Sequence, residues 1–274
     1  MLPNLVIIGA MKCGTTSLHY YLGLHPRIRM SREKELEFFI AERNWSKGAE
    51  WYAAQFDGEA QVHGESSPNY TAARRFPGVA ARMHQVIPSA KLIFMVRDPV
   101  QRLIAHYVHN SSYGNERRPL CEVIHDDHFL ERSMYWLQLR EYLAYFPADR
   151  ILIVSADDLR EYRRVTMRRV FEFLEVDPDF YSRRFQVERH PTSRKRRKTR
   201  AGAWLATTKL AHWMEKRPQP WRWVLQELLY LPFSTKFERP VLEESERLAL
   251  VERLREDAIR FRDFTALPFT QWSV

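Results

Sequence analysis

The N-terminal part of the chain combines a short apolar run, a loop of small residues and a helical pattern. Asn4 to Ile8 reads as a buried strand, because it is short, rich in β-branched residues and stopped by Gly9. From Thr15 to Leu24, apolar residues such as Leu18 and Leu22 recur on one helical face. A strand that leads through a tight loop into a helix is typical of an α/β fold.

Two further apolar runs extend this alternation. Lys91 to Val96 predicts a second strand, and Arg150 to Ser155 predicts a third, followed by a helix from about Tyr162 to Leu174. Strands separated by helices indicate a parallel sheet with helices on both faces. We therefore expect an α/β fold with a central parallel sheet flanked by helices, and ligands beyond the carboxyl ends of its strands.

The pattern becomes helical and rich in tryptophan from Gly202 onward, and a last amphipathic helix is predicted from about Glu243 to Arg262. We expect one domain over residues 1–274, in which 1–200 form the α/β core and 201–274 form a helical extension packed on it. The alternative for the extension is a surface that grips an acceptor or touches a membrane.

The charge balance favours anionic partners. The 274 residues carry 43 Lys and Arg against 34 Asp and Glu, a net charge of +9, which suits nucleic acid, an acidic membrane face or a polyanionic small ligand. No run reaches the roughly 20 apolar residues that cross a bilayer, and nothing at the N-terminus resembles a signal peptide. Cys13 and Cys121 are too few for a disulfide framework, so a reducing compartment, by default the cytoplasm, is expected.

The loop from Gly9 to Thr16 reads GAMKCGTT. Small residues let backbone N–H groups approach a phosphate, and the following helix adds the positive end of its dipole. Lys12 can place a charge on a bridging oxygen, while Thr15 and Thr16 can donate hydroxyl hydrogen bonds. A Walker A motif needs lysine directly before the hydroxyl residue. Here lysine comes earlier, which argues against an ATPase or a kinase.

Strand, GxxKxGTT loop and helix together resemble the 5'-phosphosulfate loop of the sulfotransferases that use 3'-phosphoadenosine-5'-phosphosulfate (PAPS), in the branch of bacterial enzymes and heparan sulfate sulfotransferases. The resemblance implies that the central sheet is P-loop-like and that residues 1–200 form the α/β nucleotide-binding core. It implies that Lys12 stabilises charge on the leaving phosphate. It also implies that the 5' end of the donor is held by Met11, Lys12, Cys13, Gly14, Thr15 and Thr16.

Lys91 to Tyr107 (KLIFMVRDPVQRLIAHY) is similar to the 3'-phosphate segment of that family. The resemblance places Arg97 on the 3'-phosphate, but Ala105 stands where the family usually has a serine. The basic run from Arg194 to Arg200 would correspond to the loop that closes over the nucleotide. Its cofactor-binding residues would be Arg194, Lys195 and Arg196; the alternative is a solvated basic loop.

Ser31 to Phe39 resembles the KEPHFF element of the family, which implies Glu35 as the general base with Lys34 beside it. This stretch contains three glutamates, so the alternative to a catalytic role is that they form a charge cluster on the protein surface. His63 and Glu65 are reserve candidates for the base, because they are expected to follow a short strand that ends near the same pocket.

Gly64 to Tyr70 looks like a GE-K-S-P-x-Y element, with Ser66 in the place where glycosaminoglycan enzymes carry lysine. The substitution weakens the case for a polyanionic glycan acceptor. The acceptor stays open among a glycan, a lipid and a small natural product, and Tyr107, Tyr113 and Trp136 could stack on its ring or belong to the core.

Sulfuryl transfer needs in-line geometry, charge stabilisation and proton removal, and it demands no metal. The only metal-like cluster, His125 to His128 (HDDH), lacks a third ligand group at a plausible spacing. We expect PAPS as co-substrate, no metal and no nucleic-acid partner, with peripheral membrane contact left open. The competing functions are a P-loop nucleotide-binding protein and a basic nucleic-acid-binding protein, for which no further motif is visible.

Overall fold

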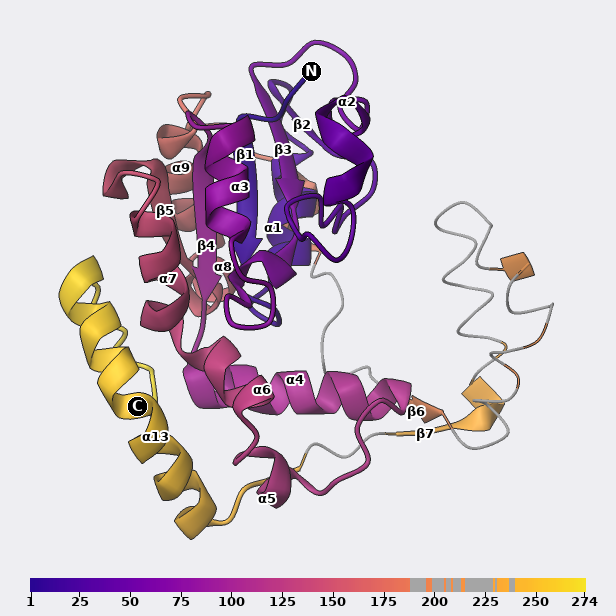
Figure 1. The fold of residues 1–274 in the computed structure, drawn as a ribbon, viewed down its shortest axis with the longest axis vertical. Coiled ribbons are helices and arrows are strands. Elements are labelled where there is room, and N and C mark those ends of the chain that lie inside the picture. The colour runs from indigo at the N-terminus through magenta and orange to yellow at the C-terminus, as the bar shows by residue number, and fades with distance from the viewer. Residues whose placement is uncertain are drawn as a thin grey trace.

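A computed structural model gives the fold of the chain (Figure 1). It describes residues 1–187 and 240–274, and between them residues 196–198 and 231–236 and the single positions 205, 208, 213, 214 and 229. No helix in this described part is long and apolar enough to cross a membrane.

The centre of the fold is a parallel sheet with strand order β2-β3-β1-β4-β5. Because all five strands run in one direction, their carboxyl ends meet at one edge of the sheet. The strands are β1 (Leu5–Gly9), β2 (Ile28–Met30), β3 (Val62–Ser66), β4 (Lys91–Val96) and β5 (Ile151–Ser155). The three strands predicted from sequence are confirmed to within a residue or two at each end.

Helices cover both faces of the sheet, as the α/β prediction requires (Figure 1). On one face α3 meets α7, and the ring of His84 in α3 lies 5.5 Å from that of Phe146, which follows α7. On the other, α1 meets α9, where Arg163 lies over the ring of Tyr21. The helices of the described residues are α1 (Thr15–Leu22), α2 (Gly48–Ala53), α3 (Val79–Val86), α4 (Pro99–Tyr113), α5 (Leu120–Val123), α6 (Asp127–Leu130), α7 (Tyr135–Leu143), α8 (Ala156–Glu161), α9 (Arg163–Phe173) and α13 (Glu244–Thr265).

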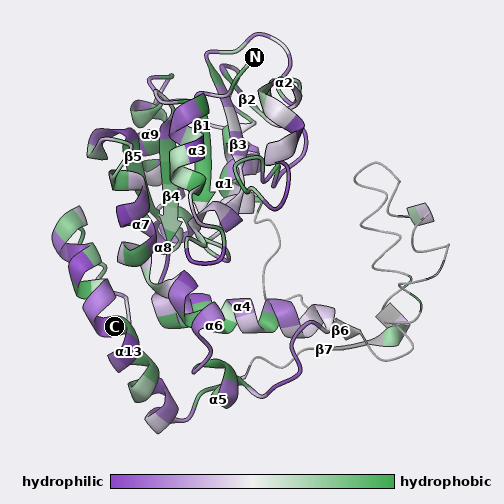
Figure 2. Ribbon diagram, viewed as in Figure 1, coloured by the Kyte–Doolittle hydropathy of each residue, from purple (hydrophilic) through white to green (hydrophobic). Residues whose placement is uncertain are grey.

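The core consists of the strands and the helix faces that lie against them. Every residue of β1 is buried, and Figure 2 shows the strand in its hydrophobic colour. Burying a Leu, Ile or Val side chain contributes roughly 1.5–3 kcal/mol, so this one strand secures the loop that follows it. A parallel strand covered on both faces reads as a continuous apolar run, which is why sequence patterning detects β1 and β4 well.

Two residues lie between the end of β4, which is the second strand predicted from sequence, and the start of helix α4. Pro99 occupies its first turn, and the Asp98 carboxylate accepts a hydrogen bond from the Gln101 N–H at 2.7 Å. The same carboxylate accepts hydrogen bonds from the backbone N–H and hydroxyl of Ser273, so the C-terminal segment is tied to the start of α4.

Helix α13, at the lower left in Figure 1, packs on α4 and α7. The Asp257 carboxylate accepts hydrogen bonds from the N–H groups of Trp136 and Leu137 at 3.0 and 2.8 Å, which caps the start of α7. Most of residues 201–239 lie outside the described residues, so the predicted division into a core and a helical extension stays a prediction.

Gly9 provides a test of this fold, because it ends β1 against Thr71. A Cβ atom at Gly9 would overlap the Thr71 side chain, whereas Gly48, which has a φ of +79°, has no atom within 4 Å of the corresponding position. Gly9→Ala is therefore expected to lower the free energy of unfolding by about 3 kcal/mol, against about 1 kcal/mol for Gly48→Ala. Urea denaturation measures both. Equal losses in the two variants would mean that Thr71 moves aside at little cost.

Candidate active site

A cavity of about 400 Å³ lies at the carboxyl edge of the sheet. Residues that directly follow each of the five strands contribute to its wall, as expected for an open parallel sheet. They are Met11 to Ser17 after β1, Lys34 and Glu35 after β2, Pro68 and Asn69 after β3, Arg97 after β4, and Ala156, Asp157, Leu159 and Arg160 after β5. Tyr21, His109, Tyr113 and Arg163 complete the wall from α1, α4 and α9.

The loop after β1 is shaped to present its backbone to this cavity. Gly14 takes a left-handed conformation (φ +84°) at the N-cap of α1 and offers no side-chain cap. Lys12 is also left-handed (φ +72°), and the Cys13 N–H is turned back onto the Ala10 carbonyl at 3.1 Å. The first N–H groups of α1, at Thr15 and Thr16, have no partner within the helix and lie at its positive end, an arrangement that suits a phosphate or sulfate.

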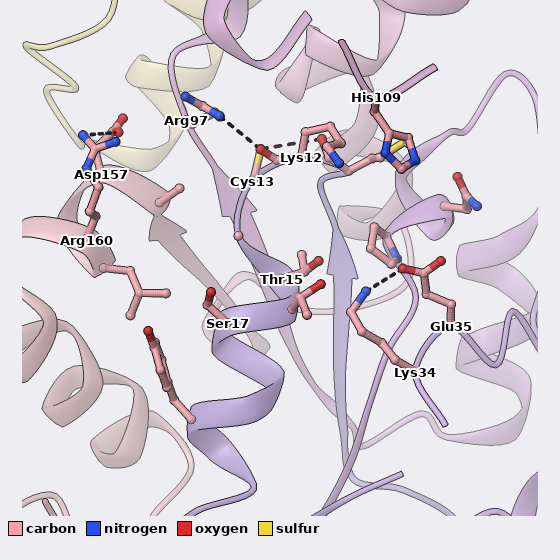
Figure 3. Close-up of a pocket in the computed structure, with 18 of the residues that line it drawn as sticks. Lys12, Cys13, Thr15, Ser17, Lys34, Glu35, Arg97, His109, Asp157 and Arg160 are labelled. Atoms are coloured by element: carbon pink, nitrogen blue, oxygen red, sulfur yellow. Dashed lines mark hydrogen bonds and ion pairs between the residues drawn. The ribbon is translucent and has the colours of Figure 1, made fainter. Parts of the chain in front are cut away.

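Arg97 brings the second predicted phosphate segment to the same place. Its Nη1 donates to the Lys12 carbonyl at 3.4 Å (Figure 3). Its Nε atom is buried and has no hydrogen-bond partner. A buried guanidinium N–H without a partner is costly unless a ligand accepts its hydrogen bond. Arg97 and the loop therefore both suit an anionic ligand in this cavity.

Lys34 and Glu35 face the loop from the opposite side of the cavity (Figure 3). Lys34 Nζ lies 2.6 Å from Glu35 Oε1. The Glu35 N–H donates to the Ser66 carbonyl at 2.9 Å, and its backbone is left-handed, with φ +68°. A non-glycine residue in that region costs of order 1 kcal/mol, which the surrounding structure must offset. The half-exposed carboxylate is thereby turned into the cavity.

The model of a family described as sulfotransferase domain matches residues 2–218. The chain belongs to the sulfotransferase family. Mouse heparan sulfate glucosamine 3-O-sulfotransferase 5 is 31% identical over 192 residues, which are 65% of this chain and 54% of the mouse protein. The membrane-associated sulfotransferase kil1 of Dictyostelium discoideum is 39% identical over 111 residues, 39% of this chain and 22% of that protein. The chain thus spans about half, or less, of the length of these relatives.

Solved sulfotransferases share the fold. The crystal structure of a sulfotransferase from Alicyclobacillus acidocaldarius has a TM-score of 0.62 and 25% identity, over 81% of this chain and 99% of that one. A mouse sulfotransferase complexed with PAP, the desulfated donor, has a TM-score of 0.55 over 93% of this chain and 83% of its own, with 10% identity, which supports the fold alone. The predicted family and fold are confirmed, and sulfotransferases use PAPS as donor.

Glu65, a reserve candidate for the base, does not line the cavity of this sulfotransferase. It lies within β3, not after it as the sequence suggested, and it is completely buried. Its carboxylate accepts hydrogen bonds from the hydroxyls of Tyr52 and Ser67 at 2.7 Å and of Tyr70 at 2.8 Å. Burial raises the pKa of Glu65, while the three hydroxyls favour its ionised form. This arrangement is that of a structural carboxylate.

His63, the other reserve candidate, also lies within β3 and is 2% exposed. Its Nε2 is 3.0 Å from the Gly58 carbonyl, and the residue does not line the cavity. The prediction that His63 and Glu65 follow a strand is therefore wrong in position: both belong to the strand. Of the three candidates for the base, Glu35 is the one that lines the cavity.

Asn69 is a cavity residue that sequence reasoning missed. Its Oδ1 accepts from Arg132 Nη1 at 3.0 Å, and its Nδ2 donates to the Glu37 carboxylate at 2.5 Å. Arg132 also reaches the Met11 sulfur at 3.2 Å. Burial and the neighbouring charges of Arg102 and Arg75 lower the pKa of Arg132 to about 9. Glu37 and Arg132 thus hold Asn69 in place.

Helices α4 and α8 contribute further wall residues, of which sequence reasoning missed His109, Asp157 and Arg160. His109 and Tyr113, one turn apart near the C-terminal end of α4, have rings 4.9 Å apart. Asp157 and Arg160, one helical turn apart on α8, form an ion pair at 3.1 Å (Figure 3). Of the aromatic residues considered for acceptor stacking, Tyr113 lines the cavity. Tyr107 donates to the Arg118 carbonyl and Trp136 packs on Phe264.

The basic run is described only in part. Arg194 and Lys195 lie outside the described residues. Arg196 begins β6 (Arg196–Lys198), which pairs antiparallel with β7 (Ser234–Lys236) beside α4 (Figure 1). Ala105 is buried in α4 and has no polar side-chain atom, so it contributes no hydrogen bond to a 3'-phosphate.

The HDDH segment, His125 to His128, contributes to the stability of the fold through a helix cap and ion pairs. Asp126 caps α6 and pairs with Arg118 at 2.7 Å, and Asp127 pairs with Arg253 at 3.0 Å. Within the residues that the structure describes, no group of three His, Cys, Asp or Glu side chains could hold a metal ion.

The hydroxyls of Tyr52, Ser67 and Tyr70 form a cage around the Glu65 carboxylate, and this cage gives a stability prediction. Glu65→Gln replaces one acceptor oxygen with a donor, so at least one buried hydroxyl loses its acceptor, and the free energy of unfolding should fall by about 2 kcal/mol. The same change at the exposed Glu50 should have an effect within about 0.5 kcal/mol. Chemical denaturation of both variants measures the difference. A Glu65→Gln protein as stable as Glu50→Gln would show that the cage is dispensable.

Proposed function

We propose that this chain transfers a sulfuryl group from PAPS to a hydroxyl or amine of an acceptor. The observation that carries the proposal is the meeting of two phosphate-binding segments in one cavity: the loop at Lys12 and the strand end at Arg97 are joined by a hydrogen bond of 3.4 Å. The candidate base, Glu35, lines the same cavity.

In this proposal the loop residues Met11 to Thr16 hold the 5'-phosphosulfate and Arg97 holds the 3'-phosphate. Arginine suits the latter because its fork of N–H donors matches phosphate oxygens. We further propose that Arg194, Lys195 and Arg196 add charge near the 3'-phosphate. The course of β6 beside α4, the helix that follows Arg97, supports this assignment for Arg196.

The proposed reaction is a single in-line displacement at sulfur. The bond between sulfur and the bridging oxygen of the 5'-phosphate breaks, and a bond forms between sulfur and the acceptor oxygen or nitrogen. The acceptor proton passes to the Glu35 carboxylate, which gives up its ion pair with Lys34 in doing so. Lys12 neutralises the charge that develops on the leaving phosphate.

The acceptor is proposed to be a glycan, a lipid or a small natural product. The names of the heparan sulfate relatives support a glycan. Ser66, which takes the place of the lysine of glycosaminoglycan enzymes, is completely buried and contributes nothing to the cavity wall. Tyr113 and His109 offer rings against which a sugar or aromatic acceptor could stack. Cytoplasmic location stays a proposal, supported by two free cysteines.

Donor binding is the first test. Isothermal titration should give tight binding of PAP and much weaker binding of ATP, which carries no 3'-phosphate. Lys12→Ala and Arg97→Ala should each weaken PAP binding by tenfold or more, on the order of one charge-assisted hydrogen bond. Arg168→Ala, a charge-matched change on the exposed face of α9, should leave it unchanged. Lys12→Ala should also slow transfer on the order of 100-fold. Wild-type protein that prefers ATP would refute the sulfotransferase assignment.

The base is tested by Glu35→Gln. The variant should lose transfer while keeping PAP affinity within about twofold, because Glu35 is assigned to the acceptor proton and not to the donor. Glu33→Gln, at a nearby exposed position that does not line the cavity, is the matched control and should stay active. Transfer is followed by PAP release. Full activity of Glu35→Gln would remove it from the mechanism.

A further inference from the structure

Tyr135 lies between the two halves of the proposed donor site, although no motif points to it. It is the first residue of α7 and is 1% exposed. Its ring packs against Phe94 of β4, Phe261 of α13 and Trp272 of the C-terminal segment, with centroids 5.5–5.7 Å away. Contacts on these sides leave the ring little freedom to shift, so its hydroxyl has a defined position.

The hydroxyl of Tyr135 makes three polar contacts. It donates to the Arg97 carbonyl at 2.9 Å and accepts from the Arg97 N–H at 3.3 Å. The third contact is with Cys13 Sγ at 3.5 Å. A phenol has one hydrogen to donate. Because that hydrogen goes to Arg97, the Cys13 thiol must be the donor in the third contact.

These contacts join the two phosphate segments. Cys13 belongs to the loop assigned to the 5'-phosphosulfate, and Arg97 is assigned to the 3'-phosphate. The Tyr135 side chain, which comes from α7, fixes both the N–H and the carbonyl of Arg97 at the end of β4. Burial raises the pKa of both the Cys13 thiol and the Tyr135 phenol, so each keeps its proton at neutral pH.

Resting on the proposed function, we propose that Tyr135 is a positioning residue that sets the distance between the 5'-phosphosulfate loop and Arg97. The site thereby selects a nucleotide with phosphates at both the 3' and the 5' positions over one with a 5'-phosphate alone. Tyr135 touches neither phosphate and acts through Arg97 and Cys13.

Helix α7 supplies a matched control. Tyr142, two turns further along, is also 1% exposed, and its hydroxyl donates to the Tyr70 carbonyl at 3.0 Å. It lines no part of the cavity. Tyr135→Phe and Tyr142→Phe each remove one buried hydroxyl and a hydrogen bond to a backbone carbonyl. Tyr135→Phe, which loses three polar contacts, should therefore lose at least as much stability as Tyr142→Phe, which loses one, and only Tyr135→Phe should change nucleotide selection.

The test measures the affinities of PAP and AMP for wild type and both variants by isothermal titration, together with their melting temperatures. Tyr135→Phe should bind PAP about tenfold more weakly and AMP less than threefold more weakly, so that the preference for PAP falls. Tyr142→Phe should keep the wild-type preference. An unchanged preference in Tyr135→Phe, or an equal fall in Tyr142→Phe, would overturn the proposal.

A double-mutant cycle separates this mechanism from a general loosening of the site. If Tyr135 acts through Arg97, Tyr135→Phe should change the PAP preference little in an Arg97→Ala background. Full additivity of the two losses would refute action through Arg97. Failure of wild-type protein to bind PAP at all would refute the proposed function, a result distinct from either outcome for Tyr135.

Discussion

The pairing of β1 with β4 is the interaction on which the site depends. Ile7 lies beside Ile93, and at the end of the pair the Ala10 N–H donates to the Met95 carbonyl at 2.7 Å. This bond sets where the Lys12 loop begins relative to Arg97. A slip of one residue would turn every side chain of β1 to the opposite face. Burial of both faces makes that slip costly, so the hydrophobic core fixes the spacing of two polar segments far apart in the sequence.

Buried positive charge is the second constraint. Arg102 is completely buried, and its guanidinium donates to the Ser133 hydroxyl and the Phe129 carbonyl, both at 2.6 Å. Burial lowers its pKa to about 10. Within the described residues, neither Arg102 nor Arg132 forms an ion pair with a carboxylate. Burying these like charges costs folding free energy, which the hydrogen bonds of Arg102 to Ser133 and Phe129 and of Arg132 to Asn69 help to offset.

Sequence reasoning found the parts of the site whose signal is local. Each of these parts is a motif of consecutive residues, so one sequence is enough to recognise it. They are the loop at Lys12, the strand end at Arg97 and the segment at Glu35, and all three line the cavity. Strand β2 is only three residues long and gives no usable periodicity. Tyr135 was missed because its role arises from contacts with residues distant in the chain, which no local pattern encodes.

The choice among carboxylates illustrates the same limit. Glu35 and Glu65 each stand in a family-like motif, and sequence alone left both open as the base. Strand β3 is buried on both faces, so no alternation reveals which side chains point inward. Three hydroxyl donors use the acceptor capacity of Glu65, whereas the partner of Glu35 is Lys34, at the edge of an open cavity. A base must release its partner to take a proton, and an ion pair exposed to water can do so at far smaller cost than a buried cage of hydroxyls.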